Sequence, residues 1–326
     1  MSDWLIYRGA GEPHDGIDRL PVPPPWRGFD GGPVLGPPPE LDTASVRRLG
    51  HGRTSASYQP LGEDLELINA ALYLRRPLLV TGAPGTGKST IPHSVARELR
   101  LGQVLTWPVV SRSTLLEGLY SYDAIGRLQD AQLGHTTDDI GRYIRLGPLG
   151  TALLPWQRPR VLLIDEIDKS DVDLPNDLLN VLEEGQFTIP ELERAADRSP
   201  VASVFTHDGE RVEVTEGRVR CRAFPFVVLT SNGERDFPAP LLRRCLHLFL
   251  PQPDHERLAA VVRAHLGEEA ASGGQELIQQ FLQRSDAGPL AVDQLLNALY
   301  LSVYSGDPTT RSRLAELLMR PLDQRG

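Results

Sequence analysis

Short, continuously apolar runs alternate with stretches of helical periodicity through the middle of the chain. Five runs have the length of a β-strand, at residues 77–81, 104–110, 161–164, 226–230 and 246–250. Amphipathic stretches accompany them, such as the one in which Leu65, Ile68 and Leu72 recur at helical spacing. Strands that are apolar on both faces need cover on both faces, so this alternation predicts an α/β fold with a parallel sheet between helices.

The C-terminal part of the chain shows helical periodicity only. Apolar positions recur every three or four residues in four runs, which begin at Leu258, Leu277, Leu295 and Leu314. Breakers separate these runs at 273–274, 288–289 and 307–308. We therefore expect an α/β core over residues 58–250, followed by a small all-helical lid domain over residues 251–326.

Residues 1–57 differ from the rest of the chain because prolines and glycines crowd them. Such a stretch excludes long helices and central strands and favours extended polyproline geometry. Three aromatic residues lie within it, Trp4, Trp26 and Phe29. The segment is either a flexible arm or an extended arm that its aromatics pin onto this chain or a partner. Aromatic residues are unusual in a purely solvating linker, which favours the second interpretation.

Charge and composition narrow the class of protein. Among the 326 residues, 43 acidic side chains outnumber 34 basic ones, for a net charge of -9. This balance disfavours a nucleic-acid partner, which needs a basic face. The two cysteines lie far apart with no metal-ligand spacing, and no apolar run is long enough for a membrane span. We expect a cytoplasmic protein that has no membrane partner and no signal peptide.

A glycine-rich loop follows the first predicted strand and matches the phosphate-binding pattern G-x-x-x-x-G-K-[ST]: Gly82-Ala83-Pro84-Gly85-Thr86-Gly87-Lys88-Ser89. Glycines let successive backbone N–H groups turn around a β-phosphate, Lys88 reaches the β and γ phosphates of ATP, and the Ser89 hydroxyl ligates Mg²⁺. A helix that begins at Lys88 adds its positive end, and Thr90 is assigned to the same site. The preceding strand and the following helix argue against a chance glycine turn.

Two further strand ends carry polar groups that complete a hydrolytic site. Asp165 and Glu166 follow the strand 161–164, where Asp165 would hold Mg²⁺ and Glu166 would act as general base on water. Asn232 follows the strand 226–230 and can orient the lytic water, although a turn-capping role is the alternative. Each signal is weak alone, and together they predict an ATP hydrolase.

Arg243 and Arg244 stand together shortly after that strand. An arginine can stabilise charge on a transferring phosphoryl group, and a neighbouring subunit usually has to supply it. The alternative is a pair of solvated arginines at a helix end, where the helix dipole favours cations. The sequence does not distinguish one arginine from the other.

The order of four motifs resembles the MoxR branch of the AAA+ ATPases: GAPGTGKST, LLIDEIDKSD, PNDLLNVLEEGQFTIPE and VLTSNGERDFPAPLLRRC. The resemblance covers about residues 58–304. It implies an ATPase core, a helical lid and a homo-oligomeric ring, usually a hexamer, in which an arginine finger acts in trans on ATP and Mg²⁺. It also implies a chaperone that remodels or activates a protein partner, often one with a von Willebrand factor A domain. The segments 20–27 and 143–150 resemble the MoxR subset of multi-component bacterial conflict systems.

The resemblance also assigns two inserts and exposes one departure. Residues 112–147 match a helix-2 insert whose apolar side chains would project toward a pore or partner, namely Leu115, Leu116, Leu119, Tyr120 and Tyr122. Residues 187–224 match a pre-sensor hairpin, within which 211–214 alternates like a strand. The basic sensor-2 residue is missing from the run 287–295, and Arg284 is the candidate substitute. That gap keeps a slow nucleotide-gated switch as the alternative function, while a DNA-acting motor is disfavoured by the charge.

Overall fold

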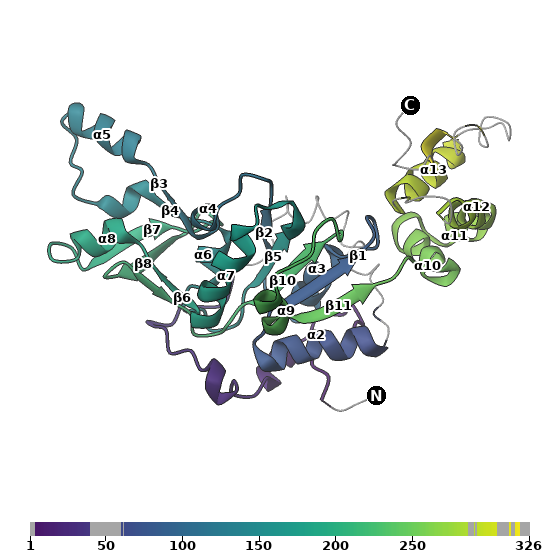
Figure 1. The fold of residues 1–326 in the computed structure, drawn as a ribbon, viewed down its shortest axis with the longest axis horizontal. Helices are drawn as coiled ribbons and strands as arrows, with labels where there is room; N and C mark the ends of the chain where they lie inside the picture. Colours follow the sequence, from purple (N-terminus) through teal and green to yellow (C-terminus); the bar gives the residue numbers. More distant parts are fainter. Residues whose placement is uncertain are drawn as a thin grey trace.

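The computed structural model describes residues 4–39, 60, 62–285, 290, 292–304, 313 and 317–319. The chain forms three regions along one long axis (Figure 1). A parallel sheet with its helices lies in the middle, a helical domain lies at one end, and a second sheet lies at the other. Among the described residues, no helix has the length and apolarity that crossing a membrane requires.

The central sheet contains five parallel strands. Their order is β11 (Leu246–Leu250), β1 (Leu78–Gly82), β10 (Phe226–Ser231), β5 (Val161–Asp165) and β2 (Leu105–Pro108). Each strand coincides with one of the five predicted apolar runs to within two residues at either end. β10 is buried along its whole length. The predicted α/β fold is therefore confirmed. β2 is shorter than the predicted run because pairing with β5 ends at Pro108.

Helices cover both faces of this sheet and produce two separate hydrophobic clusters. Successive side chains of a strand point to opposite faces, so Leu78 and Val80 enter one cluster while Leu79 enters the other. The first cluster packs α2 (Gly62–Leu74) and α3 (Thr90–Glu98) against the sheet. The second packs α6 (Pro148–Ala152), α7 (Asp173–Glu184) and α9 (Ala239–Arg244). Both faces are thus buried, as the continuous apolar runs require.

A second, six-stranded sheet joins the two inserts. Its order is β3 (Tyr120–Tyr122), β4 (Ile144–Leu146), β7 (Val201–Phe205), β8 (Arg211–Thr215), β9 (Arg218–Arg220) and β6 (Gln186–Thr188). The alternation at 211–214 predicts β8, and that strand is present with every second residue buried. The remaining strands were not predicted. A pairing between Arg145 and Phe205 links the two inserts into one sheet.

The apolar side chains of the first insert do not project as the resemblance implied. Leu119 and Tyr120 are buried, and Leu115 and Tyr122 pack against the same cluster, so of the five only Leu116 is exposed, at 55%. That expectation was wrong because α4 (Leu115–Leu119) and β3 carry these residues into the second sheet and its core. The other exposed large apolar residues of this insert lie on and just after α5 (Ala124–Gln132): Ile125, Leu128 and Leu133.

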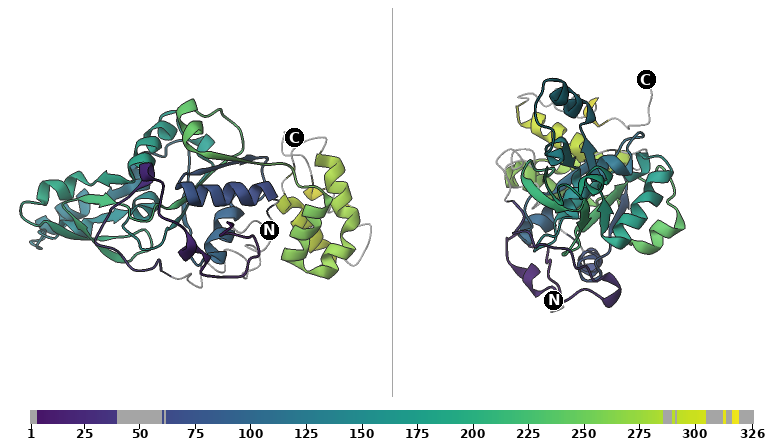
Figure 2. Two further views of the ribbon diagram at one scale, coloured as in Figure 1. Left: turned by 90° about the horizontal axis from the view of Figure 1, so that it is seen from below. Right: turned by 90° about the vertical axis from the view of Figure 1, so that its left-hand side faces the viewer.

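The described part of the N-terminal segment, residues 4–39, lies along the α/β core as an extended arm (Figures 1 and 2). It contains only two short 3-10 turns, η1 (Gly16–Arg19) and η2 (Pro25–Arg27). Ile6, Tyr7 and Ile17 enter the cluster beneath α2, whereas Trp26 is 73% exposed. Residues 4–39 therefore follow the pinned-arm interpretation on this chain itself, anchored mainly by side chains other than tryptophan.

The C-terminal region is helical: α10 (His255–Leu266), α11 (Glu268–Gly273), α12 (Gln275–Ser285) and α13 (Val292–Tyr304). A third hydrophobic cluster joins them, with Leu258, Ile278 and Leu295 at its centre. Gly273 and Gly274 separate α11 from α12, as the breaker pattern predicts. The breakers at 288–289 and 307–308 lie outside the described residues, and the proposed domain boundaries stay predictions.

Candidate functional site

The phosphate-binding loop connects β1 to α3 at the carboxyl edge of the sheet. Gly82 has a φ of 154°, and a Cβ there would lie 2.3 Å from the carbonyl oxygen of Leu250. Gly85 and Gly87 have φ values of 76° and 89°, in the left-handed region that favours glycine. The loop conformation therefore depends on these three glycines. α3 begins at Thr90, two residues later than the sequence predicts, because residues 88 and 89 form a turn.

Lys88 points back into this loop. The residue is 7% exposed, and its ammonium donates to the carbonyl oxygens of Gly82 at 2.9 Å and Ala83 at 2.8 Å. Burial lowers the pKa of Lys88, and the nearby carboxylates, Asp168 foremost, oppose that shift. Among the described residues, this buried cation donates hydrogen bonds to backbone carbonyls alone, and it is placed to exchange them for phosphate oxygens.

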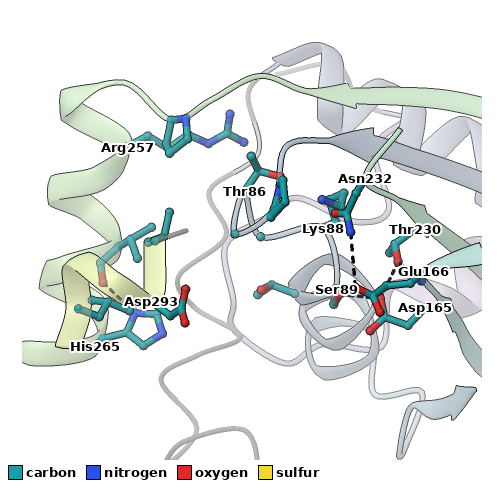
Figure 3. Close-up of a pocket in the computed structure, with 18 residues that line it drawn as sticks. Thr86, Lys88, Ser89, Asp165, Glu166, Thr230, Asn232, Arg257, His265 and Asp293 are labelled. Atoms are coloured by element: carbon teal, nitrogen blue, oxygen red, sulfur yellow. Dashed lines mark hydrogen bonds between the residues drawn. The ribbon is translucent and has the colours of Figure 1, made fainter. Parts of the chain in front are cut away.

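The two predicted metal ligands meet at the end of β5. Asp165 Oδ1 accepts a hydrogen bond from Ser89 Oγ at 2.8 Å and another from Thr230 Oγ1 at 2.5 Å (Figure 3). A carboxylate and a hydroxyl from different elements thus lie together beside the loop. Oxygen ligands of this kind suit Mg²⁺, which also keeps waters and substrate phosphate oxygens in its shell. The residues present therefore fit the metal, and their role as ligands stays a prediction.

Glu166 and Asn232 also lie together, with a lysine that the sequence analysis missed. Asn232 Nδ2 donates to Glu166 Oε1 at 3.4 Å, and Lys169 Nζ donates to Glu166 Oε2 at 2.6 Å. The hydrogen bond to Glu166 raises the pKa of Lys169. Glu166 has a φ of 58°, and its N–H donates to Thr230 Oγ1 at 2.9 Å, which fixes the unusual backbone.

A second residue that the sequence analysis missed is Asp168, which joins the turn after β5 to the loop after β10. Its side chain is buried, and Oδ2 accepts from the N–H groups of Asn232 at 2.9 Å and Glu234 at 3.1 Å. Oδ1 has no hydrogen-bond partner among the described residues. The signal in the sequence was an acidic residue three positions after Asp165, with the apolar Ile167 between them.

A cavity of about 420 Å³ lies between the loop and the helical domain. Residues 84–90 line it, together with Asp165, Glu166, Thr230 and Asn232. Gly82 and Ala83 do not line the cavity, although their carbonyls bind Lys88. The helical side contributes charged and apolar side chains from α10 and α13: Arg257, Val261, His265, Val292, Asp293 and Leu296 (Figure 3).

Arg284 is not the lid arginine that reaches this cavity. It lies on α12, where Nη1 is 3.5 Å from the carbonyl oxygen of Met319, inside the helical domain. Arg257 lines the cavity instead, and its Nη2 is 3.4 Å from Asp64 Oδ2. The reason is placement, because α10 follows the last strand directly and faces the loop. Arg257 can be recognised as a cavity residue only from the position of α10 in the structure.

Arg243 and Arg244 lie in the last turn of α9, and neither lines the cavity of its own chain. Arg244 Nε lies 3.0 Å from Glu183 Oε1. No hydrogen bond or ion pair joins the Arg243 side chain to any described residue. The structure of one chain therefore keeps both arginines away from the phosphate loop, and the finger role stays a prediction that needs a second subunit.

Comparison with known families identifies the class of protein. The profile of the AAA domain (dynein-related subfamily) matches residues 77–245, which is just over half of the chain. The chain therefore belongs to this family, and the α/β core with its phosphate loop is an AAA ATPase domain. Domains of this kind bind ATP, typically with Mg²⁺. A comparison with the curated proteins found no match.

A comparison with solved structures found matches that include two bacterial proteins. NtrX from Brucella abortus in complex with ADP is 16% identical, with a TM-score of 0.40 over 79% of this chain and 56% of that chain. The RuvB Holliday junction branch migration motor of Thermotoga maritima is 15% identical, with a TM-score of 0.38 over 77% of this chain. The chain spans 66% of the length of RuvB.

Proposed function

We propose that this protein is a MoxR-like AAA+ ATPase that couples ATP hydrolysis to remodelling or activation of a protein partner. The observation that supports it best is the convergence of five predicted groups on one cavity, namely Lys88, Ser89, Asp165, Glu166 and Asn232. The quoted motif order, which resembles the MoxR branch, supports the finer assignment. An alternative site elsewhere would not explain why groups from the loop after β1, from the end of β5 and from the loop after β10 lie together.

The loop and the lid divide the binding of ATP between them. The loop over residues 84–90, which lines the cavity, would offer backbone N–H groups to the phosphates, and Lys88 would supply the charge opposite the β and γ phosphates. Val261, Val292 and Leu296 give an apolar surface for the base or sugar, and Arg257 adds a cation on the same side. Mg²⁺, held by Ser89 and Asp165, would neutralise charge that develops on the phosphates.

Hydrolysis uses Glu166 and Asn232. Glu166 accepts a proton from a water whose oxygen bonds to the γ-phosphorus, while the bond from that phosphorus to the bridging oxygen breaks and ADP leaves. Asn232 Nδ2 lies beside the same carboxylate and can hold the water in line. Lys169 must release Oε2 before that oxygen can take the proton. This last point favours the slow nucleotide-gated switch as the second candidate function.

A ring completes the site in this proposal. Because neither arginine of α9 reaches its own cavity, a neighbouring subunit would present Arg243 or Arg244 to the γ-phosphate, and a homo-hexamer is the expected assembly. The partner would be a protein, expected to carry a von Willebrand factor A domain. The acidic net charge of -9 supports a protein partner over a nucleic acid.

Subunit mixing tests the proposal. Glu166→Gln removes the base and keeps the shape, so this variant should bind ATP, hydrolyse little and stay assembled. A variant with both Arg243→Ala and Arg244→Ala lacks the finger and keeps the base. Co-assembled mixtures should regain turnover, because some interfaces pair an intact finger with an intact base. Mixtures that co-assemble and stay as inactive as each variant alone would exclude a finger in trans.

Steady-state ATPase turnover, measured with and without added partners, separates the candidate functions. Turnover that rises with a captured protein partner supports remodelling, and turnover that stays slow with every partner supports the switch. Turnover that rises with duplex DNA and not with protein would replace both with a DNA motor. A pull-down from the native host supplies the protein partner for the first arm.

A further inference from the structure

We propose that Arg27 of the N-terminal arm is a positioning residue for Arg244, one of the arginine pair of α9, acting through Glu183 at the end of α7. The inference rests on the proposed function, in which this pair serves a neighbouring subunit. It assigns a role to the arm at Arg27, which does not line the nucleotide cavity.

Arg27 joins the arm to two elements of the core. Its guanidinium is 5% exposed and donates four hydrogen bonds to three backbone carbonyls. Nε and Nη2 bind the carbonyl oxygen of Arg75 at 3.1 and 2.7 Å, Nη2 binds that of Leu182 at 3.0 Å, and Nη1 binds that of Glu183 at 3.1 Å. One side chain therefore connects the end of α2 with the end of α7.

The contact with α7 is favourable for an electrostatic reason. The carbonyls of Leu182 and Glu183 lie in the last turn of α7, where carbonyls lack partners within the helix and the dipole is negative. A guanidinium at this position satisfies both carbonyls and complements the dipole. Burial lowers the pKa of Arg27, and the Glu183 carboxylate opposes that shift. Arg27 therefore attaches the C-terminal end of α7 to the arm.

Two aromatic rings fix the plane of the Arg27 fork. Phe29 and Phe224 stack with centroids 5.2 Å apart, and the Arg27 guanidinium carbon lies 5.2 Å from the first ring and 4.5 Å from the second. A planar cation suits such faces, and a lysine cannot reproduce the stacked, forked geometry. Arg27→Lys is therefore a test of geometry at constant charge.

Glu183 carries the connection from Arg27 to α9. Its Oε2 lies 3.8 Å from Arg27 Nη1, and its Oε1 lies 3.0 Å from Arg244 Nε. Arg244 Nη1 is also 3.3 Å from the carbonyl oxygen of Pro240, within α9. The Glu183–Arg244 pair is partly exposed, at 44% and 43%, so it adds little to stability. What it fixes is the orientation of one arginine relative to α7.

The positioning role predicts an asymmetric defect. In Glu183→Ala, the phosphate loop and base are intact, so the subunit should accept a finger from a neighbour normally. Its own α9 arginines should be poor donors. Turnover of the uniform assembly should fall about 10- to 100-fold, because small misplacements of catalytic groups cause losses of this size. KM for ATP should stay near wild type. Arg27→Lys should show the same pattern, and Arg19→Ala, in the same arm, should behave as wild type.

Two mixtures test this asymmetry, with the double arginine variant described above as reference. Glu183→Ala mixed with Glu166→Gln should regain turnover, because the second variant donates good fingers to good bases. Glu183→Ala mixed with the double arginine variant should show no more turnover than Glu183→Ala alone, because neither partner donates a good finger. Urea unfolding of Glu183→Ala should match wild type, which separates positioning from loss of fold.

The outcomes distinguish this inference from the function on which it rests. If Glu166→Gln rescues the double arginine variant and Glu183→Ala rescues it equally well, Glu183 does not position the fingers and only the present inference is wrong. A uniform Glu183→Ala or Arg27→Lys assembly with wild-type turnover overturns it in the same way. If Glu166→Gln fails to rescue despite co-assembly, the trans arrangement itself is wrong, and this inference is overturned with it.

Discussion

Replacing Thr230 with valine removes one hydroxyl from the centre of the site and little else. Thr230 is almost fully buried, and its Oγ1 donates to Asp165 Oδ1 while it accepts from the N–H of Glu166. Valine keeps the branched shape. The substitution therefore removes the hydroxyl that Asp165 and the backbone of Glu166 share as a hydrogen-bond partner.

The expected cost follows from these two hydrogen bonds. A bond to a charged group is worth about 1.5–3 kcal/mol, and an N–H left unpaired in a buried site costs about 1–3 kcal/mol. The free energy of unfolding should fall by about 2.5–6 kcal/mol on this basis. If the transition state loses only the stabilisation from the hydrogen bond to Asp165, kcat/KM should fall about 10- to 100-fold.

Steady-state ATPase measured over a range of Mg²⁺ concentrations is the assay. In Thr230→Val the Mg²⁺ requirement should rise, because Asp165 loses the hydroxyl that holds it when Ser89 turns to the metal. Thr230→Ser keeps the hydroxyl and is the matched control, with turnover within a few fold of wild type. If Thr230→Val retains wild-type turnover and Mg²⁺ dependence, the hydroxyl does not organise the site and this reasoning is refuted.

Three further predictions test other parts of the molecule. Lys88→Ala should abolish ATP binding in a calorimetric titration, and unchanged affinity would contradict the phosphate-loop assignment. Asn69→Ala removes a buried amide that pairs with three backbone groups of the arm. The substitution should lower the free energy of unfolding by about 3 kcal/mol and speed hydrogen exchange at the arm's amides. Amides that stay protected would show that Asn69 does not hold the arm on the core. Burial raises the pKa of the Cys221 and Cys245 thiols to about 12. Both should therefore resist alkylation at pH 8 until the protein unfolds, and their contribution to stability, full below pH about 9, should be lost as pH rises toward about 12.

The features that could be predicted from the sequence are the ones encoded over a few neighbouring residues. A buried parallel strand is a short apolar run, so the runs that became β1, β5 and β10 could be found directly. The phosphate loop needs glycine at positions where the backbone adopts positive φ, which restricts residue types so strongly that the motif is visible by itself. Asp165 and Glu166 were identified because they stand at the end of such a strand.

Other features depended on contacts between segments that are far apart in the chain. β3 and β4 have three residues each, too few for a periodic signal, and they become a sheet only by pairing with the hairpin strands. The same packing buried Leu119 and Tyr120, which local hydrophobicity could not distinguish from exposed docking residues. Aromatic content indicated that the arm is pinned, but not that Arg27 would be one of its anchors.

The helical side of the nucleotide cavity shows why some features could be predicted from local sequence and others could not. Local sequence determines that α10 is a helix, through its apolar periodicity and the Asp254 side chain that accepts from Arg257 N at its start. Which of its faces meets the phosphate loop depends on how the helical domain packs against the sheet. That packing, rather than any motif, brings Arg257 to the cavity and turns Arg284 toward Met319. Backbone conformation is largely a local property, whereas the residues that the helical side contributes to the cavity are decided by tertiary contacts.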